Sequence, residues 1–472
     1  MTPVTRIVIV GGGPGGYEAA LVAVQLGAEV TVVEREGVGG AAVLTDCVPS
    51  KTLIATAEVM TSFADSHQEL GIYVDDGTPG TLDRPIVGVD LDVVNKRVLE
   101  LAQAQSVDIA NGLRRAGVTV LRGTARLDGP RRVVATLDDG SEETLEADAL
   151  LISTGATPRV LPGAEPDGER ILDWKQVYGL TSLPRELIVV GSGVTGAEFA
   201  GAYQALGSKV TLVSSRDRVL PGEDPDAAEV LEAAFRRRGM RVMSRSRAES
   251  VERMGDSVIV RLQDGQTLEG SHCLMAVGAV PNTAGMGLEE AGVALKESGH
   301  IRVDRVSRTT AGGVYAAGDC TGVFALASVA AMQGRIAMYH MLGDAVSPLD
   351  LKAVASNVFT DPEIATCGHS QAEVEAGEID AHIVKLPLSR NPRAKMQGIH
   401  DGFVKLFCRP GTGIIIGGVV VAPRASELIH AVSLAVDLHL TVDQVASAFT
   451  VYPSISGSLA EAARRLHRRD RV

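Results

Sequence analysis

The stretch RIVIVGGGPGGYEAALVAVQLGAEVTVVE, residues 6–34, decides the fold of the first part of the chain. Its pattern predicts a buried strand, a glycine turn, a helix and a second strand that ends in an acid. The glycines have the spacing of a dinucleotide-binding fingerprint, and Glu34 follows them by about 20 residues. In this pattern the glycines admit a pyrophosphate at the helix N-terminus, while the carboxylate binds ribose hydroxyls. The loop residues that we expect at this nucleotide are Gly11, Gly13, Pro14, Gly15 and Gly16.

A second unit of the same kind begins at residue 185 with RELIVVGSGVTGAEFAGAYQALGSKVTLVSSRDRVL. Gly191, Gly193 and Gly196 again lie between a predicted strand and a predicted helix. Two dinucleotide folds in one chain predict two bound nucleotides, one a fixed prosthetic group and the other an exchanging substrate. Hydride transfer between two nucleotides requires that both are bound by the same protein and face each other.

The second unit departs from the fingerprint where its second strand ends. Ser214 stands at the position of the ribose-binding carboxylate and is followed by Ser215 and Arg216. Loss of the carboxylate removes a repulsion toward a 2′-phosphate, which a guanidinium and two hydroxyls can bind. We therefore expect NADPH to be accepted. The alternative is that these are ordinary loop residues and that NADH serves as well.

Length, composition and charge exclude several classes of protein. A chain of 472 residues predicts about three domains, because single cores seldom grow beyond roughly 250 to 300 residues. The formal net charge of −13 argues against nucleic-acid binding, which needs clustered Lys and Arg. No apolar stretch approaches the ~20 residues that a membrane span requires.

The N-terminus and the cysteines indicate the compartment. The first predicted strand starts at Ile7, which leaves no room for a signal peptide. The five cysteines are widely separated and lack metal-ligand spacing, so we expect neither a disulfide framework nor a metal site. These features predict a cytoplasmic protein.

A third motif, GGAAVLTDCVPSKT at residues 39–52, resembles the redox segment of the lipoamide dehydrogenase and glutathione reductase family. The similarity extends over essentially the whole chain, through LISTGATPR, VYAAGDCTG, LASVAAMQGRIA, NVFTDPEIATCG and VYPSISGSL. The resemblance implies an FAD-containing homodimer of class α/β, with two Rossmann-like domains and an α+β dimerisation domain. The implied boundaries are 1–155 and 282–345 for FAD, 156–281 for NAD(P)H, and 346–472 for dimerisation.

The same resemblance implies roles for individual residues. Lys51 is expected beside the reactive nitrogen of the flavin and paired with Glu198, because a buried Lys and Glu offset each other's desolvation. Strict NADPH selectivity stays open, since Ala279 lies where relatives often carry Arg. The other implied nucleotide contacts are Ala42 in the redox segment, Ala125 near the adenine, Gly155 in a nearby turn, Asp319 at the ribityl or pyrophosphate region, Ala327 at the start of a helix facing the pyrimidine ring, and Gly278 at the second nucleotide.

Two departures from the family pattern decide the expected reaction. Disulfide reductases of this family have two cysteines in the redox segment, but here Ala42 stands five residues before Cys47. A single sulfur leaves no internal disulfide to exchange with lipoamide or glutathione disulfide. Near the C-terminus, Tyr452 and Gly457 replace the His and Glu that the family uses for thiol acid and base chemistry. Both the nucleophile and its proton relay are therefore missing.

These features predict an NAD(P)H:quinone reductase that passes hydride to FAD and then, in a ping-pong cycle, electrons to a quinone or similar small acceptor. This resembles the quinone-reducing branch of the family found in mycobacteria and related actinobacteria. We expect Lys51, Glu198, Cys47 and Tyr452 at the catalytic centre. Two alternatives are a soluble pyridine nucleotide transhydrogenase and a non-catalytic FAD-bound subunit or redox sensor.

Overall fold

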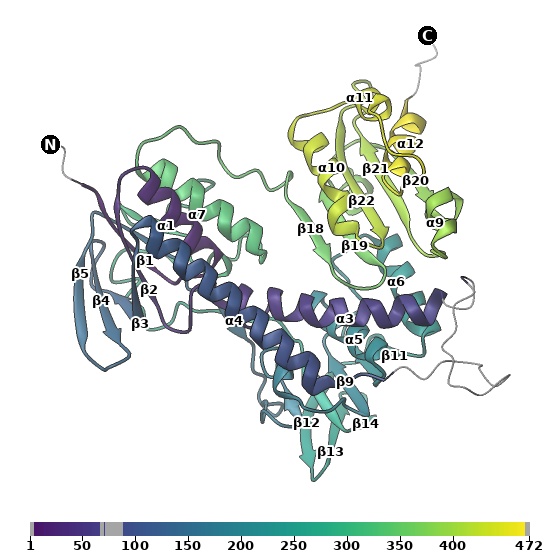
Figure 1. Cartoon of the computed structure of the whole chain (residues 1–472), viewed down its shortest axis with the longest axis horizontal. Coiled ribbons are helices and arrows are strands. Elements are labelled where there is room, and N and C mark those ends of the chain that lie inside the picture. Colours follow the sequence, from purple (N-terminus) through teal and green to yellow (C-terminus); the bar gives the residue numbers. More distant parts are fainter. Residues whose placement is uncertain (1–3, 67–69, 71–87, 468–472) are drawn as a thin grey trace. The chain divides into compact units, whose positions relative to one another are not determined.

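The computed structural model describes residues 4–66, 70 and 88–467 (Figure 1). The chain divides into two compact units, and each is described by itself. The first comprises Met1–Thr52, Asn95–Arg159 and Gly278–Asp350, and the second comprises Leu53–Val94, Val160–Val277 and Leu351–Val472. The second nucleotide-binding part thus groups with the C-terminal part, and the expected domain boundaries stay predictions. Two helices, α3 (Cys47–Ser66) and α4 (Leu91–Ala116), contain residues of both units.

The first unit is built on a seven-stranded sheet in the order β17-β6-β1-β2-β3-β4-β5. Four consecutive residues of β1, Ile7 to Val10, are buried, as is typical of a parallel strand covered on both faces. β1 pairs in parallel with β2 and β6, whereas β3, β4 and β5 form an antiparallel extension. The strands are β1 (Arg6–Val10), β2 (Glu29–Glu34), β3 (Thr119–Leu127), β4 (Arg132–Leu137), β5 (Glu142–Glu146), β6 (Ala149–Ile152) and β17 (Val314–Ala316).

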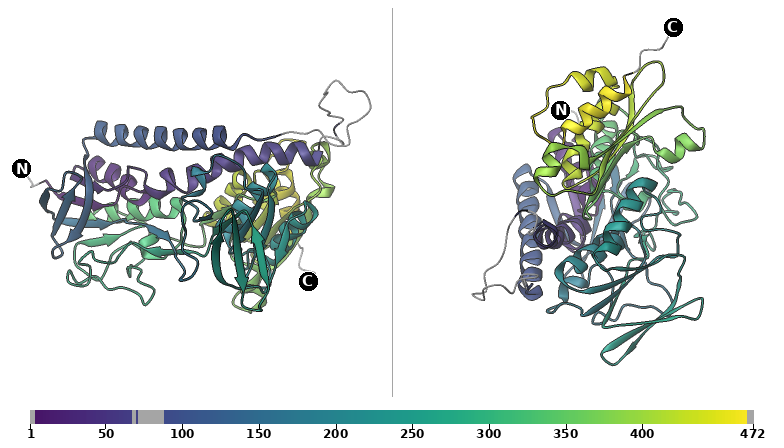
Figure 2. Two further views of the ribbon diagram at one scale, coloured as in Figure 1. Left: turned by 90° about the horizontal axis from the view of Figure 1, so that it is seen from below. Right: turned by 90° about the vertical axis from the view of Figure 1, so that its right-hand side faces the viewer.

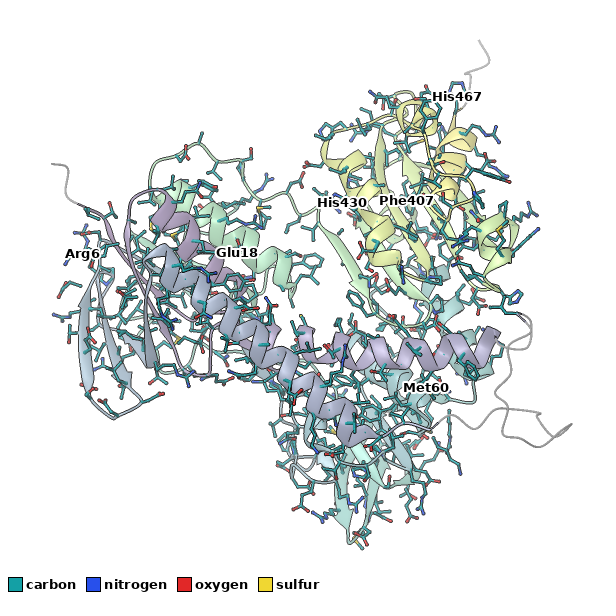
Figure 3. The ribbon with its side chains drawn as sticks, in the orientation of Figure 1. Arg6, Glu18, Met60, Phe407, His430 and His467 are labelled. Atoms are coloured by element: carbon teal, nitrogen blue, oxygen red, sulfur yellow. The ribbon has the colours of Figure 1, made fainter. Side chains whose placement is uncertain are left out.

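Helices α1 (Pro14–Gln25) and α7 (Ala327–Met341) pack against each other in the first unit. Glu18 of α1, labelled in Figure 3, forms an ion pair of 3.7 Å with Arg335 of α7. The shorter elements are α2 (Gly40–Leu44), η2 (Asp319–Thr321) and a two-stranded sheet of β7 (Ala156–Pro158) and β16 (Ala279–Pro281). Both α1 and α7 begin at the carboxyl edge of the large sheet, the usual place for a nucleotide.

The second unit contains another parallel sheet, in the order β11-β10-β9-β15-β8. Its strands are β8 (Ile171–Leu172), β9 (Glu186–Val190), β10 (Lys209–Val213), β11 (Arg241–Met243) and β15 (His272–Met275), and its helices are α5 (Val194–Leu206) and α6 (Pro225–Arg237). An antiparallel sheet of β12 (Ala248–Met254), β13 (Ser257–Leu262) and β14 (Thr267–Gly270) adjoins it, and η1 spans Val177–Gly179. The connection from strand to glycine loop to helix repeats that of the first unit.

The C-terminal part of the second unit is a five-stranded antiparallel sheet in the order β18-β19-β22-β21-β20 (Figures 1 and 2). Its core contains Phe407, which is fully buried and labelled in Figure 3. Helices α10 and α12 pack on this sheet. The elements are β18 (Ala355–Val358), β19 (Glu363–Gly368), β20 (His382–Pro387), β21 (Phe403–Cys408), β22 (Ile415–Ala422), α8 (Gln371–Glu375), η3 (Leu388–Arg390), α9 (Pro392–Met396), α10 (Ala425–Asp437), α11 (Val442–Ser447) and α12 (Gly457–Leu466).

The expected fold class is confirmed: two dinucleotide-binding folds of class α/β are followed by an α+β C-terminal part. In the part of the chain that the structure describes, no helix combines the length and apolar character needed to cross a bilayer.

Candidate functional site

The first glycine loop leaves β1 and enters α1 in the form that a dinucleotide requires. Gly11 has a φ of +102°, and a Cβ there would lie 2.2 Å from the carbonyl oxygen of Ser153. A Cβ on Gly16 would lie 1.9 Å from the carbonyl oxygen of Gly11, so helix and turn touch directly. At Gly13 the nearest atom to a built Cβ is 4.0 Å away, which leaves space before the N-terminus of α1. These three positions fit a pyrophosphate approached by backbone amides.

Glu34 ends β2 beside this loop, as the fingerprint predicts. Its side chain is buried, and its Oε2 accepts a 2.6 Å hydrogen bond from the amide of Gly12. Its Oε1 accepts from the amides of Glu36 at 2.7 Å and Gly37 at 3.2 Å. Oε2 accepts one hydrogen bond among these and so keeps a second lone pair. The carboxylate is therefore fixed in place and able to accept a hydrogen bond from a ribose hydroxyl.

The redox segment folds into two helices that leave a single sulfur at the expected position. Ala42 lies in α2, and Cys47 is the first residue of α3. Lys51 lies on the same helix and is partly exposed. None of the five cysteines is in a disulfide, and Cys320 is fully buried. The structure thus contains no cysteine pair of the kind that disulfide reductases use.

Asp319 is the first residue of η2 and follows the end of β17 by three positions. Burial, together with the negative charge of Asp46, raises the pKa of Asp319 from its ordinary value of 3.8 to about 6. Asp46 could not be identified from the sequence, because nothing in the local pattern brings it near Asp319. A bound cofactor with hydroxyl groups would find a carboxyl group here that can accept or donate a hydrogen bond.

The remaining residues expected around FAD are distributed over the first unit. Ala125 lies on β3 and is partly exposed, and Ala327 is the first residue of α7. Gly155 has a φ of +67° and no atom within 4 Å of a built Cβ, so the space beside it is open. Their contacts with a cofactor remain predictions.

The second glycine loop repeats the first in detail. Gly191 has a φ of +110°, and a Cβ there would lie 2.1 Å from the carbonyl oxygen of Ala276. A Cβ on Gly196 would lie 1.8 Å from the carbonyl oxygen of Gly191. Gly193 has nothing within 4 Å of a built Cβ and is exposed, and the same holds for Gly278. The loop is therefore open at the position where a pyrophosphate would lie.

Ser214 differs from the expectation of a direct contact between its side chain and the nucleotide. It is completely buried, and its hydroxyl lies 2.7 Å from that of Ser192 in the glycine loop. The same hydroxyl accepts a hydrogen bond from the amide of Arg216 at 3.1 Å. A buried, fully bonded hydroxyl cannot reach a ribose unless the turn opens. Ser215 and Arg216, by contrast, are exposed.

Glu198 lies on α5 in the second unit and is almost completely buried. Its Oε1 accepts a 2.9 Å hydrogen bond from the amide of Phe359, in the loop between β18 and β19. This partner comes from the C-terminal part of the chain, and no signal in the sequence indicates it. The expected pairing of Glu198 with Lys51 of the first unit stays a prediction.

Tyr452 and Gly457 occupy the positions of the absent His and Glu. Tyr452 is 83% exposed, and Phe449 and Val451 beside it are also exposed. Gly457 is the first residue of α12 and has no side chain that could orient a proton-transfer group. The two positions thus hold neither a His nor a carboxylate.

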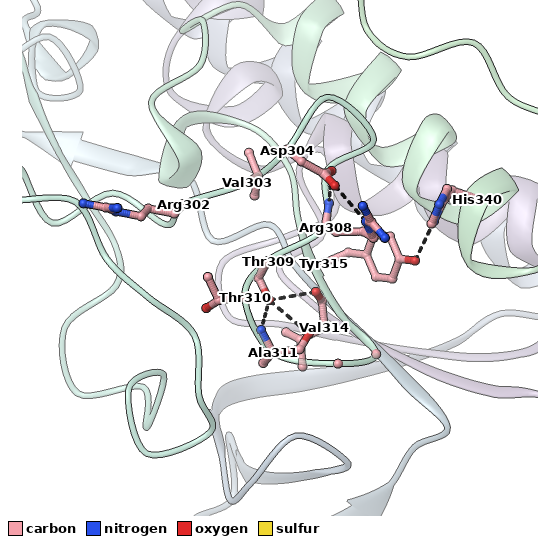
Figure 4. Close-up of a pocket in the computed structure, with 12 residues that line it drawn as sticks. Arg302, Val303, Asp304, Arg308, Thr309, Thr310, Ala311, Val314, Tyr315 and His340 are labelled. Carbon is pink, nitrogen blue, oxygen red and sulfur yellow. Dashed lines mark hydrogen bonds and ion pairs between the residues drawn. The ribbon is translucent and has the colours of Figure 1, made fainter.

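A separate hollow of about 540 Å³ lies in the first unit (Figure 4). It is bordered by Asp304 and Arg308, which form an ion pair of 2.7 Å, and by Tyr315 and His340, whose Oη and Nδ1 are 2.8 Å apart. It lies at the amino end of β17, whereas the glycine loop follows the carboxyl end of β1. None of the expected site residues lines it. Among the described residues, no group of three or more His, Cys, Asp or Glu is arranged to hold a metal ion.

Comparisons with known proteins agree with this architecture. A sequence model of the pyridine nucleotide-disulphide oxidoreductase family matches residues 5–334, and a model of that family's dimerisation domain matches residues 354–463. An NAD(P)H dehydrogenase (quinone) of Mycobacterium tuberculosis is 54% identical over 476 residues, which covers 99% of this chain and 95% of that protein.

More distant relatives carry other names. A mercuric reductase of Acidithiobacillus ferrooxidans is 37% identical over 98% of this chain and 83% of its own length. A dihydrolipoyl dehydrogenase of Chlorobaculum parvum is 33% identical over 97% of this chain and 96% of its own length.

A solved structure has the same fold over nearly the whole chain. The crystal structure of LpdA from Mycobacterium tuberculosis superimposes with a TM-score of 0.93 at 53% identity, covering 98% of this chain and 100% of that one. The chain therefore belongs to the pyridine nucleotide-disulphide oxidoreductase family, whose members bind FAD and use NAD(P)H.

Proposed function

We propose that this protein is an FAD-dependent NAD(P)H:quinone oxidoreductase and not a disulfide reductase. The observation that carries the proposal is Ala42, which leaves Cys47 as the one sulfur of the redox segment. A dithiol cannot form at this segment, so electrons from NAD(P)H have no sulfur relay to a disulfide substrate. The name of the 54% identical relative supports a quinone as the acceptor.

FAD, when bound, supplies the two-electron chemistry between nicotinamide and acceptor. The first glycine loop would hold its pyrophosphate, and Glu34 would hold its adenosine ribose. The second glycine loop would bind NADPH or NADH. Lys51 would place a positive charge near the flavin ring, and Glu198, oriented by the amide of Phe359, would neutralise it in a site that excludes water.

We also propose that the protein acts as a homodimer. Phe449, Val451 and Tyr452 form an exposed apolar segment, which a monomer would leave in water. The segment lies inside the match to the dimerisation domain, so a second copy of the chain is the expected partner. Tyr452 would then lie at the acceptor side of the partner subunit's flavin, where its aromatic ring offers a surface for a quinone.

Steady-state kinetics on the purified holoprotein test the proposal. NADH and NADPH would each be combined with benzoquinones, naphthoquinones, lipoamide and glutathione disulfide. We expect parallel double-reciprocal lines with quinones, as a ping-pong cycle requires, and no turnover of the disulfides. Turnover of a disulfide at rates similar to quinones would refute the assignment. Hydride exchange between NADPH and NAD⁺ without quinone reduction would favour a transhydrogenase instead.

A further inference from the structure

Two turns lie side by side at the carboxyl edge of the second unit's parallel sheet. β10 and β11 pair in parallel, with Val213 opposite Met243, so the segments that follow them leave the sheet together. The amide of Ser214 donates a 2.8 Å hydrogen bond to the carbonyl oxygen of Met243. The amide of Arg245 donates a 2.6 Å hydrogen bond to the carbonyl oxygen of Arg216. These bonds extend the pairing beyond the strands. They hold Arg216 and Arg245 on adjacent turns.

The arginine side chains of these two turns, Arg216 and Arg245, are exposed. Within the described residues, no ion pair joins Arg216 or Arg245 to a carboxylate, including Asp217 on the same turn. The arginines at the end of α6 behave differently, since Arg236 and Arg238 each pair with a carboxylate. Two positive charges without counter-charges at a nucleotide-binding edge favour an anionic ligand.

The backbone of Arg245 gives an independent indication. Its φ is +53°, in the left-handed region that glycine adopts most easily. Strained positions of this kind concentrate at ligand-binding sites, where the side chain is needed despite the strain. A glycine at this position would relax the backbone but would remove the guanidinium.

Ser214 has a different part in the same arrangement. Its hydroxyl accepts from the amide of Arg216, just as Oε1 of Glu34 accepts from the amide of Glu36 in the first unit. Because Ser214 is completely buried, this bond shapes the turn and does not contact a ligand. This turn carries Arg216.

We propose that Arg245 and Arg216 together bind the 2′-phosphate of NADPH, and that Ser214 positions the turn that carries Arg216. This rests on the proposed use of NAD(P)H at the second glycine loop. A pyrophosphate at that loop, which follows β9, places the adenosine ribose next to β10, the neighbouring strand. A phosphate dianion there can receive charge-assisted hydrogen bonds from both guanidinium groups.

Binding of nucleotide fragments to the FAD-containing protein tests this without any turnover. The probes are 2′,5′-ADP and 5′-AMP, which differ only by the 2′-phosphate, and their affinities are measured by calorimetry. We expect Arg245→Gln and Arg216→Gln each to weaken 2′,5′-ADP binding by roughly 10-fold or more, the usual effect of losing a charge-assisted bond. Binding of 5′-AMP changes less than about twofold. Arg241→Gln is the matched control, because Arg241 is an exposed arginine at the other end of β11.

The variant Arg245→Gly separates a lost contact from a damaged fold. Because glycine relieves the left-handed strain, this variant is expected to melt no lower than the wild type while still losing 2′,5′-ADP affinity. The proposal is overturned if both Arg245 variants bind 2′,5′-ADP within about twofold of the wild type. It is also overturned if their affinity for 5′-AMP falls by the same factor as their affinity for 2′,5′-ADP. The two proposals can fail separately. If the protein does not reduce quinones but still discriminates the two probes through Arg245, the proposed function is wrong and the 2′-phosphate site stands.

Discussion

The ammonium nitrogen of Lys405 lies 2.9 and 2.8 Å from the two carboxylate oxygens of Asp224, although both side chains are almost completely buried. Asp224 also caps the N-terminus of α6 by accepting from the amides of Asp226 and Ala227. Because Lys405 lies on β21, the pair joins the second nucleotide-binding part to the C-terminal sheet within one compact unit.

Replacing Lys405 with Met leaves the charge of Asp224 buried without a counter-charge. We expect a loss of about 3 to 5 kcal/mol in the free energy of unfolding, measured by urea titration of the holoprotein. Lys385→Met is the control, since Lys385 pairs with Asp226 at 2.8 Å but is 47% exposed, and such pairs contribute less than about 1 kcal/mol. Equal losses for the two variants would show that burial does not decide the effect.

The raised pKa of Asp319 predicts a pH-dependent stability in the flavin-free protein. Its folded-state pKa of about 6 exceeds the ordinary value of 3.8, so the neutral form is favoured on folding. This contribution is complete below pH ~4 and is lost as the pH rises through about 6. Asp319→Asn cannot ionise and gains up to about 3 kcal/mol relative to the wild type at pH 8. Melting curves at pH 4 and pH 8 check this, and a stability difference that is the same at both values contradicts it.

The first unit indicates how to shift the second unit toward NADH. Glu34 accepts from the amide of Gly12, and the corresponding pair in the second unit is Ser214 and Ser192. Ser214→Glu restores a ribose-binding carboxylate and repels a 2′-phosphate, so we expect a shift toward NADH of roughly 1 to 3 kcal/mol. The ratio of kcat/KM for NADH and NADPH measures it. The variant Ser192→Gly/Ser214→Glu, which copies the first unit, is expected to shift at least as far. An unchanged ratio in both would mean that this strand end does not meet the ribose.

Removal of the Tyr452 hydroxyl tests whether the enzyme supplies a proton to the acceptor. A reduced quinone can take its protons from water, so the phenol of Tyr452 is not required as the proton donor. We expect Tyr452→Phe to lower kcat for quinones by less than about fivefold, well short of the ~100-fold or greater loss typical of a missing general acid. A loss of that larger size, with an unchanged rate of flavin reduction by NADPH, would identify Tyr452 as a proton donor.

Much of the fold follows from local sequence, because strand, glycine turn and helix are adjacent in the chain. Gly11, Gly16, Gly191 and Gly196 lie where the fingerprints predict, since each touches backbone that only glycine allows. The burial of Ser214 was not foreseeable, as it depends on Ser192 in a loop 22 residues away.

Long-range polar contacts were equally inaccessible from the sequence. Lys405 and Asp224 are 181 residues apart, and nothing in either segment specifies the other. The bond from the amide of Phe359 to Glu198 and the proximity of Asp46 to Asp319 likewise depend on how separate elements pack.

In the proposed cycle, flavin alone stores electrons between NAD(P)H and the acceptor. Anaerobic titration of the holoprotein with dithionite, followed by the flavin absorbance, tests this most directly. We expect complete reduction at about two electrons per FAD, because Ala42 leaves Cys47 without a partner sulfur. Ala42→Cys is the control, since a disulfide with Cys47 adds two more electrons. An uptake of four electrons by the wild-type protein would show a second redox group and would contradict storage by flavin alone.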